Sequence, residues 1–487
     1  MNTFTKLIIM MIFTMLTFTV LKAQDIDRTK RPQGKSAPVV KLPKIQKTQL
    51  KNGLNVWLVE RHQLPLIAFN LVIHAGSDQD PLNLPGLASM TADVLDEGTK
   101  SRDALQISEE FESIGASFNV NSSWDGSFIT LNCMSKFMEK GLDVFSDILL
   151  NPTFPEKEFQ RLQKQRITSL MQQKDQATTT ANNAFARIIY GSQHPYGSNP
   201  AGNEESIKKI TADDLRNFYQ KYYKSNNATL IIVGDAKMEI LLPLLEKVVG
   251  GWEKGEVAKF NIPEPPVLEK SEIYLIDKPG APQSEIRIGF PALARSTPDY
   301  FPVMVMNRML GGQFMSRINL NLREKHGFTY GARSGFNFLK GKGPFTASAG
   351  VHSEKTDSSV QEFLYEIKLM HDKGMTQEEL EFVKKGLIGN FALNFETSGQ
   401  IAGALQNIVL YGLPEDYFDN YLQNIEAVTL EDVKKVSEKY LDISKMAIVI
   451  VGDEAKVKKG LEKLNIGKII PCNQDGLPLT KPDQDIN

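Results

Sequence analysis

Short apolar runs alternate along the chain with longer amphipathic stretches. Residues 54–59, 67–74 and 127–132 are rich in β-branched and aromatic side chains and have the length of strands. Residues 155–173 and 376–393 instead repeat apolar positions at helical spacing over lengths typical of helices. The mixture predicts an α+β fold in which mainly antiparallel sheets pack against helices.

One pattern occurs twice. Ile210-Thr-Ala-Asp-Asp-Leu and Val428-Thr-Leu-Glu-Asp-Val each place a threonine before a helical stretch and an aspartate three residues later, which is the spacing of a capping box. A β-branched run that ends in Gly-Asp follows each, at the same distance from the threonine. We therefore expect two structurally equivalent domains, offset by 218 residues.

A proline-dense stretch separates the halves. Ile262-Pro-Glu-Pro-Pro-Val follows the last apolar run of the first half and suits an extended linker. The expected boundaries are an amino-terminal domain at residues 43–250, a linker at 251–270, a carboxy-terminal domain at 271–470 and a tail at 471–487.

The first residues have the features of an export signal. Lys6 precedes an apolar run from Leu7 to Leu21, and a plausible cleavage site ends at residue 23. The run is shorter than the ~20 residues that a membrane span needs, so no stable membrane anchor is expected. We predict a signal peptide at residues 1–23, an extended arm at 24–42 and secretion, to the periplasm in a bacterium with an outer membrane.

Composition narrows the classes of function. The 487 residues are 41% apolar and 23% charged, as in folded globular proteins. Because 56 basic residues balance 58 acidic ones, charge gives no reason to expect nucleic acid or an anionic membrane as partner. The two cysteines, Cys133 and Cys472, are compatible with free thiols or with one long disulfide.

Several motifs, in order, resemble the pitrilysin/insulinase-type zinc peptidases. In the first half they are Asn52-Gly-Leu-Asn-Val-Trp, His74-Ala-Gly-Ser, Pro85-Gly-Leu-Ala, Glu97-Gly-Thr and Gly115-Ala-Ser-Phe-Asn. In the second half they are Leu310-Gly-Gly-Gln-Phe-Met-Ser-Arg and Leu322-Arg-Glu-Lys-His-Gly-Phe-Thr-Tyr. The resemblance implies two homologous α+β domains closing on a peptide-binding cavity, with residues 117–121 as a sheet edge that either adds a substrate strand or pairs internally.

The zinc site of that family is missing here. Active members carry His-x-x-Glu-His on the helix after Pro-Gly-Leu-Ala, where two histidines bind zinc and the glutamate is the general base. The three positions are Ser89, Ala92 and Asp93 in this chain, and the third family ligand falls near Ser169 or Leu170. We interpret Asp93 as a solvated helix residue and predict no metal and no cofactor in this chain.

Arg323 and Tyr330 match a pair that, in the family, reaches the scissile carbonyl from the carboxy-terminal domain. A guanidinium and a phenol can donate to an oxygen that gains charge in the transition state. The alternative is structural, with an arginine at a helix C-terminus and a tyrosine in the core. We favour the functional interpretation, and we expect Gly311-Gly312 to be a helix-ending turn.

These observations predict the non-catalytic, substrate-binding subunit of a heteromeric zinc metallopeptidase. A homologous subunit would bring the zinc, Arg323 and Tyr330 would complete its site, and the substrate would be an unfolded peptide. The chain would be inactive alone. The alternative is an inert structural or peptide-binding scaffold of the same fold, and an active peptidase with another site is disfavoured because no nucleophile motif is present.

Overall fold

The computed structural model describes residues 44–258 and 260–479. The predicted signal peptide, the extended arm and the last eight residues of the tail lie outside the described residues. Export therefore stays a prediction, and so do the exact domain boundaries. None of the described helices is long and apolar enough to cross a membrane.

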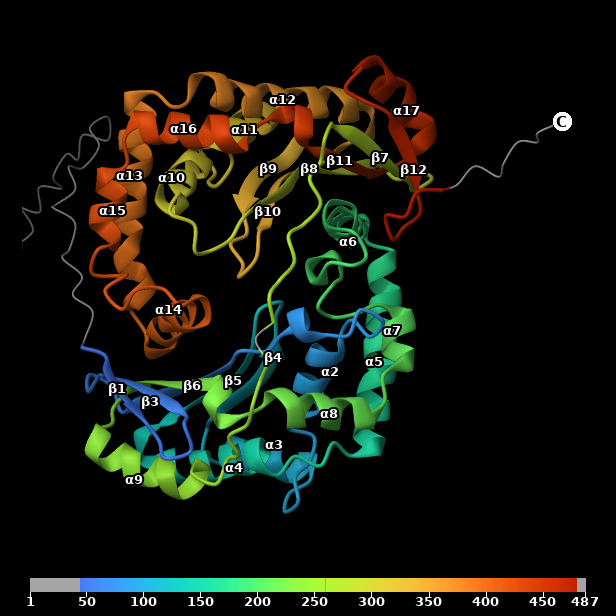
Figure 1. Cartoon of the computed structure of the whole chain (residues 1–487). Coiled ribbons are helices and arrows are strands. Elements are labelled where there is room, and N and C mark those ends of the chain that lie inside the picture. The colour runs from blue at the N-terminus through green and yellow to red at the C-terminus, as the bar shows by residue number, and fades with distance from the viewer. Residues whose placement is uncertain (1–43, 259, 480–487) are drawn as a thin grey trace, which may run out of the picture. The chain divides into compact units, whose positions relative to one another are not determined.

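The first half forms a six-stranded mixed sheet in the order β1-β2-β6-β3-β5-β4 (Figure 1). Only β2 and β6 run parallel, and the other neighbours are antiparallel. The strands are β1 (Gln46–Gln49), β2 (Asn55–Glu60), β3 (Leu66–Ile73), β4 (Ser117–Ser122), β5 (Ser127–Met134) and β6 (Ala228–Gly234). The segment predicted as a sheet edge is therefore the outermost strand, β4.

The second half forms a matching sheet in the order β12-β7-β11-β8-β10-β9. The strands are β7 (Glu272–Asp277), β8 (Gln283–Leu293), β9 (Thr329–Phe336), β10 (Gly343–His352), β11 (Ala447–Gly452) and β12 (Ile469–Cys472). Five strands repeat the first sheet one for one, including a parallel central pair, β7 with β11. The predicted repeat and the α+β class are confirmed. The outer strands β1 and β12 differ between the two sheets, because β1 is antiparallel to β2 whereas β12 is parallel to β7.

Helices cover both sheets. In the first half they are α2 (Leu87–Val94), α3 (Ala104–Ser113), α4 (Met138–Leu150), α5 (Glu156–Lys174), α6 (Ala177–Tyr190), α7 (Glu204–Lys209), α8 (Ala212–Tyr222) and α9 (Met238–Val249). In the second half they are α10 (Tyr300–Leu310), α11 (Arg317–Asn319), α12 (Thr356–Lys373), α13 (Gln377–Phe391), α14 (Ser398–Tyr411), α15 (Tyr421–Ala427), α16 (Leu430–Tyr440) and α17 (Glu454–Lys463). A π-helical segment, η5 (Leu320–Lys325), follows α11 directly.

The two predicted capping boxes are present at equivalent helices. Thr211 caps α8 and accepts from the backbone N–H of Asp214, while the Asp214 carboxylate accepts from the N–H of Thr211 at 2.9 Å. Thr429 and Asp432 repeat the same pair of bonds at α16. Each box satisfies two N–H groups that the first helical turn leaves without a partner.

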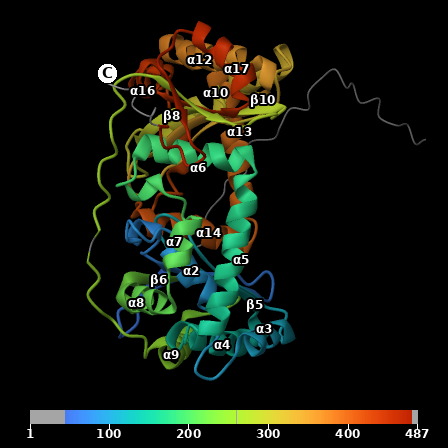
Figure 2. The same ribbon diagram turned by 90° about the vertical axis from the view of Figure 1, so that its right-hand side faces the viewer.

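The halves exchange one helix each, which the sequence did not predict. Helix α6 precedes the linker, yet it packs on β8 and β11 of the second sheet, where it is the green helix among yellow and red elements in Figures 1 and 2. Helix α14 packs in return on β3 and β6 of the first sheet. The linker itself contains no helix or strand in its described residues.

The exchange creates two apolar cores with members from both halves. Phe185 of α6 is buried with Val449 of β11, and Leu405 of α14 is buried with Val72 of β3. Polar contacts accompany them, because Arg287 Nε donates to Asn182 Oδ1 at 2.7 Å. The two halves therefore share cores instead of meeting only at a hinge.

Both cysteines are buried free thiols, so the open question of a disulfide resolves against one in this structure. Cys133 belongs to the core of the first half and Cys472 to the core around α6. Burial raises the pKa of each thiol to about 11, so both stay protonated and unreactive at neutral pH.

Candidate functional site

The helix that carries the degenerate motif is held in place by its first residues. Gly86 is the N-cap of α2 with φ of 99°, and a β-carbon there would come within 2.8 Å of the Gly202 backbone. Only glycine fits, because both the conformation and the close approach exclude a side chain. The Asp80 carboxylate accepts from the N–H groups of Gly86 and Ala88, both at 2.8 Å, which anchors the start of the helix.

An arginine lies between Ser89 and Asp93, the two residues that the motif match aligns with histidines. Arg166, on α5, directs its guanidinium at α2, where Nη1 and Nη2 each donate to Ser89 Oγ at 3.2 Å. Nη2 also forms a short ion pair with the Asp93 carboxylate, and Nη1 donates to the Ala201 carbonyl at 3.0 Å. The side chains at the two histidine positions thus share one cation, and it belongs to the protein.

This contact corrects the interpretation of Asp93 as a solvated helix residue. Its side chain is 34% exposed and paired with Arg166. Burial raises the pKa of the Asp93 carboxyl, and the attraction of the guanidinium opposes that rise. The sequence did not reveal this pairing because it joins two helices that are far apart in the chain. The one available signal was Arg166 itself, a basic residue in the segment where the third zinc ligand was expected.

The remaining motif positions do not suit a metal either. Ala92 is fully buried and carries no donor atom. Ser169 accepts a hydrogen bond from Gln173 on its own helix, and Leu170 is buried in the core. No group of three or more potential ligands comes together among the described residues. Zinc requires three or four such donors, so the residues at this position do not fit it.

Helix α2 also packs beside the edge strand β4. On β4, Phe118 and Val120 face the core while Ser117, Asn119 and Asn121 are exposed. Because β4 pairs only with β5 in the described sheet, alternate backbone groups on its other side lack a strand partner. This edge has the properties needed for adding an extended peptide.

Arg323 and Tyr330 lie in contact with each other on the second half. Arg323 sits in the π-helical segment η5, and its guanidinium lies 5.0 Å from the ring centre of Tyr330 and 4.7 Å from that of Phe314. Tyr330 is 88% exposed on the edge strand β9, which excludes the interpretation of a core tyrosine. Phe314 is 57% exposed as well, so the three side chains form one surface cluster.

The chemistry of this cluster is that of a donor pair. Arg323 pairs only with its neighbour Glu324, at 3.3 Å, among the ion pairs of the described residues. The aromatic faces orient the guanidinium by cation–π attraction and leave N–H groups available to a ligand. No hydrogen bond or ion pair within the described part of the chain connects Arg323 or Tyr330 with Ser89, Asp93 or Arg166.

The Gly311-Gly312 segment ends helix α10, as predicted. A β-carbon on Gly311 would come within 2.2 Å of the Ser334 backbone nitrogen on β9, so the turn packs directly against the strand that carries Tyr330. The turn therefore fixes the position of β9 instead of serving as a free loop.

Comparison with known proteins decides the family. A family model described as the insulinase family, peptidase family M16, matches residues 56–193, and one described as the peptidase M16 inactive domain matches residues 209–387. A crystal structure of a peptidase M16 inactive domain from Pseudomonas fluorescens shares 30% identity and a TM-score of 0.79, covering 84% of this chain and 98% of that one. The chain belongs to peptidase family M16.

Two curated relatives have lower sequence identity, but the matches cover most of the length of each relative. A protein named non-peptidase homolog YmxG from Helicobacter pylori is 26% identical over 82% of this chain and 92% of its own. An uncharacterized zinc protease YmxG from Bacillus subtilis is 24% identical over 80% and 94%. The inactive-domain matches and the non-peptidase homologue, together with the altered motif, support a non-catalytic member of family M16.

Proposed function

We propose that this protein is the substrate-binding subunit of a heteromeric M16 peptidase, in which Arg323 and Tyr330 act on the substrate carbonyl at a homologous partner's zinc site. The observation that carries the proposal is the surface cluster of Arg323, Tyr330 and Phe314. Because Tyr330 is 88% exposed, its ring contributes little to the packing of this chain. An exposed ring held by an arginine is instead suited to contact with a second molecule.

The contact of Arg166 on α5 with Ser89 and Asp93 on α2, here called the α2–α5 contact, supports the same assignment of roles to the two subunits. Because Arg166 already balances Asp93, this half has no open coordination position to offer, so the metal would come from the partner. The edge strand β4 would then hold the unfolded peptide in extended form. On this proposal the protein acts outside the cytoplasm, in the periplasm of a bacterium with an outer membrane.

The test is peptide cleavage by the protein mixed with a zinc-motif homologue from the same organism. We expect neither Arg323→Ala nor Tyr330→Phe to prevent association, but Arg323→Ala should lower kcat of the mixture by roughly 10²-fold, as loss of an oxyanion donor does. Arg333→Ala is the matched control, because Arg333 lies exposed on the same strand and outside the cluster.

Wild-type kcat for Arg323→Ala in an active mixture would contradict the assigned role. No cleavage by any mixture, together with peptide binding by this chain alone, would instead favour the inert scaffold. Association measured by analytical ultracentrifugation separates loss of assembly from loss of turnover.

A further inference from the structure

A cavity of about 560 Å³ opens in the second half, and none of the residues of the α2–α5 contact or the Arg323 cluster lines it. Most of its lining residues are aromatic, and they include Tyr300, Phe336, Phe338, Phe391, Tyr417 and Tyr421. The size, and a lining that mixes aromatic rings with polar side chains, are typical of small-molecule sites, in which a few polar groups fix the ligand.

One face of the exchanged helix α14 forms a wall of this cavity. Gln400, Ala404, Asn407 and Tyr411 follow one another at intervals of three or four residues and line the cavity. A second face of α14, with Leu405, packs in the core shared with the first sheet. The helix is thus fixed by that core, and its cavity face is preorganised.

Arg295 is the only basic residue among the described residues that line the cavity. It is 8% exposed, and its guanidinium lies 3.7 Å from the ring centre of Tyr300 and 5.0 Å from that of Tyr417. Its Nη2 donates to the Tyr417 hydroxyl at 2.6 Å, and its backbone N–H donates to the Leu339 carbonyl at 2.7 Å. Nε and Nη1 have no hydrogen-bond partner within the described residues.

No carboxylate among the described residues pairs with this arginine. None of the ion pairs in the described part of the chain includes Arg295, and no acidic residue lines the cavity. The acids beside its tyrosines have other partners, since Asp299 pairs with Lys439 at 2.8 Å and Glu415 with Lys47 at 2.6 Å.

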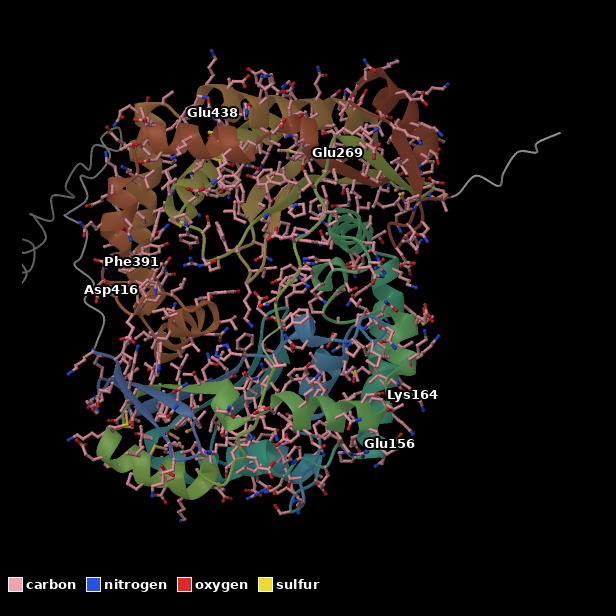
Figure 3. All side chains as sticks on the ribbon, in the orientation of Figure 1. Glu156, Lys164, Glu269, Phe391, Asp416 and Glu438 are labelled. Carbon is pink, nitrogen blue, oxygen red and sulfur yellow. The ribbon has the colours of Figure 1, made fainter. Side chains whose placement is uncertain are left out.

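Asp416 and the phenols do not supply the missing charge either. Asp416 is exposed, accepts from Asn420 at 2.8 Å and is not among the lining residues, whereas Phe391 is; Figure 3 labels both. Burial raises the pKa of the Tyr417 and Tyr421 phenols, so both stay neutral at physiological pH. A buried cation without an anion is unfavourable, and two aromatic faces compensate it only partly.

We propose that this cavity binds a carboxylate carried on an aromatic or branched apolar group. The guanidinium would bind the carboxylate through charge-assisted hydrogen bonds, and the ring wall would enclose the apolar group. Asn337 and Asn394, which also line the cavity, would complete the polar contacts. The same chemistry is presented by a free aromatic acid and by the C-terminal residue of a peptide.

Calorimetric titration of the wild-type chain alone tests the proposal. The probes are 3-phenylpropionate with its neutral amide, and the tripeptide Ala-Ala-Phe with its C-terminal amide. We expect at least one acid to bind roughly tenfold more tightly than its amide. Preference only for the small acid assigns a free metabolite, whereas preference for the tripeptide acid assigns a peptide C-terminus.

Two variants locate the binding. Arg295→Met should reduce the acid's affinity to that of the amide, whereas the control Arg333→Met, on the exposed face of β9, should leave it unchanged. Because Arg295→Met also loses the bond to Tyr417, a second variant keeps the arginine: Asn394→Asp adds an anion to the cavity wall and should weaken only the acids.

Equal affinity for acids and amides in the wild type would overturn the proposal, as would acid binding that survives both variants. Neither outcome depends on the role of Arg323 and Tyr330, since no partner subunit and no cleavage are involved.

Discussion

At the scale of single residues, the altered motif has lost its histidines and has also gained a contact, because Arg166 binds Ser89 and Asp93 at the two histidine positions. Loss of the histidines alone would leave Asp93 partly buried without a cation. Removal of one partner from such a pair leaves a buried charge and costs more than the pair contributes. Replacement of Arg166 or Asp93 alone is therefore expected to destabilise the fold. Restoring the histidines while Arg166 remains should not restore metal binding.

We predict that Ser89→His, Ala92→Glu, Asp93→His and Ser169→Glu, made together, bind zinc weakly while Arg166 is present. Adding Arg166→Met should tighten zinc binding at least tenfold, because the guanidinium repels Zn²⁺ and fills the space between the ligands. Equilibrium dialysis against buffered zinc, followed by atomic absorption, measures the difference.

The single variant Arg166→Met is the control for folding, with thermal unfolding as the readout. If the four-residue variant binds one zinc per chain tightly with Arg166 intact, the guanidinium is not what excludes the metal.

Local signals explain what could be predicted from the sequence. The caps at Thr211 and Thr429 and the strands that follow depend on neighbours within a few residues, so their patterns are readable. The match of residues 322–330 to the family motif likewise singled out Arg323 and Tyr330, which the structure places in contact. By contrast, Arg166 and Asp93 are 73 residues apart in the sequence, and no local pattern predicts which helix an arginine side chain will contact.

At the scale of elements, an ion-pair network ties the loop before α3 to α4. Arg102 Nη1 lies 2.9 Å from Asp147 Oδ2, and that carboxylate also accepts from Ser101 and Thr99, both at 2.6 Å. Burial alone would raise the pKa of Asp147, but these hydrogen bonds outweigh it and hold the pKa at about 2.

We predict that Asp147→Asn lowers the free energy of unfolding by roughly 2 kcal/mol at neutral pH. The folded-state pKa lies below the unfolded value of about 3.9, so the stabilisation is complete above pH ~5 and is lost as pH falls toward 2. The difference between wild type and variant in urea unfolding should therefore shrink from pH 5 to pH 3.

Asp143→Asn provides the matched comparison. Asp143 contacts the same arginine at 2.6 Å, but its side chain is 66% exposed, so the change should cost less than about 1 kcal/mol. Equal losses for both variants at every pH would show that charge at Asp147 is not the cause.

At the scale of the whole molecule, the exchange of α6 and α14 makes each half depend on the other for one face of its sheet. The sequence could not reveal this, because both helices have ordinary amphipathic patterns that fit either sheet. A linker without regular structure suggests two independent domains, but the shared cores contradict independence. Both halves belong to one compact unit of the chain.

The exchange predicts that both halves unfold in one transition. Phe185→Ala, in the core on the second sheet, and Leu405→Ala, in the core on the first, should each cost about 2–5 kcal/mol. Since each core includes residues of both halves, either change should increase hydrogen exchange equally in β6 and β11. Leu105→Ala is the control, because Leu105 is 66% exposed. Faster exchange in β11 alone after Phe185→Ala would mean that the halves unfold separately, and the exchanged helices would then be a docking contact and not a shared core.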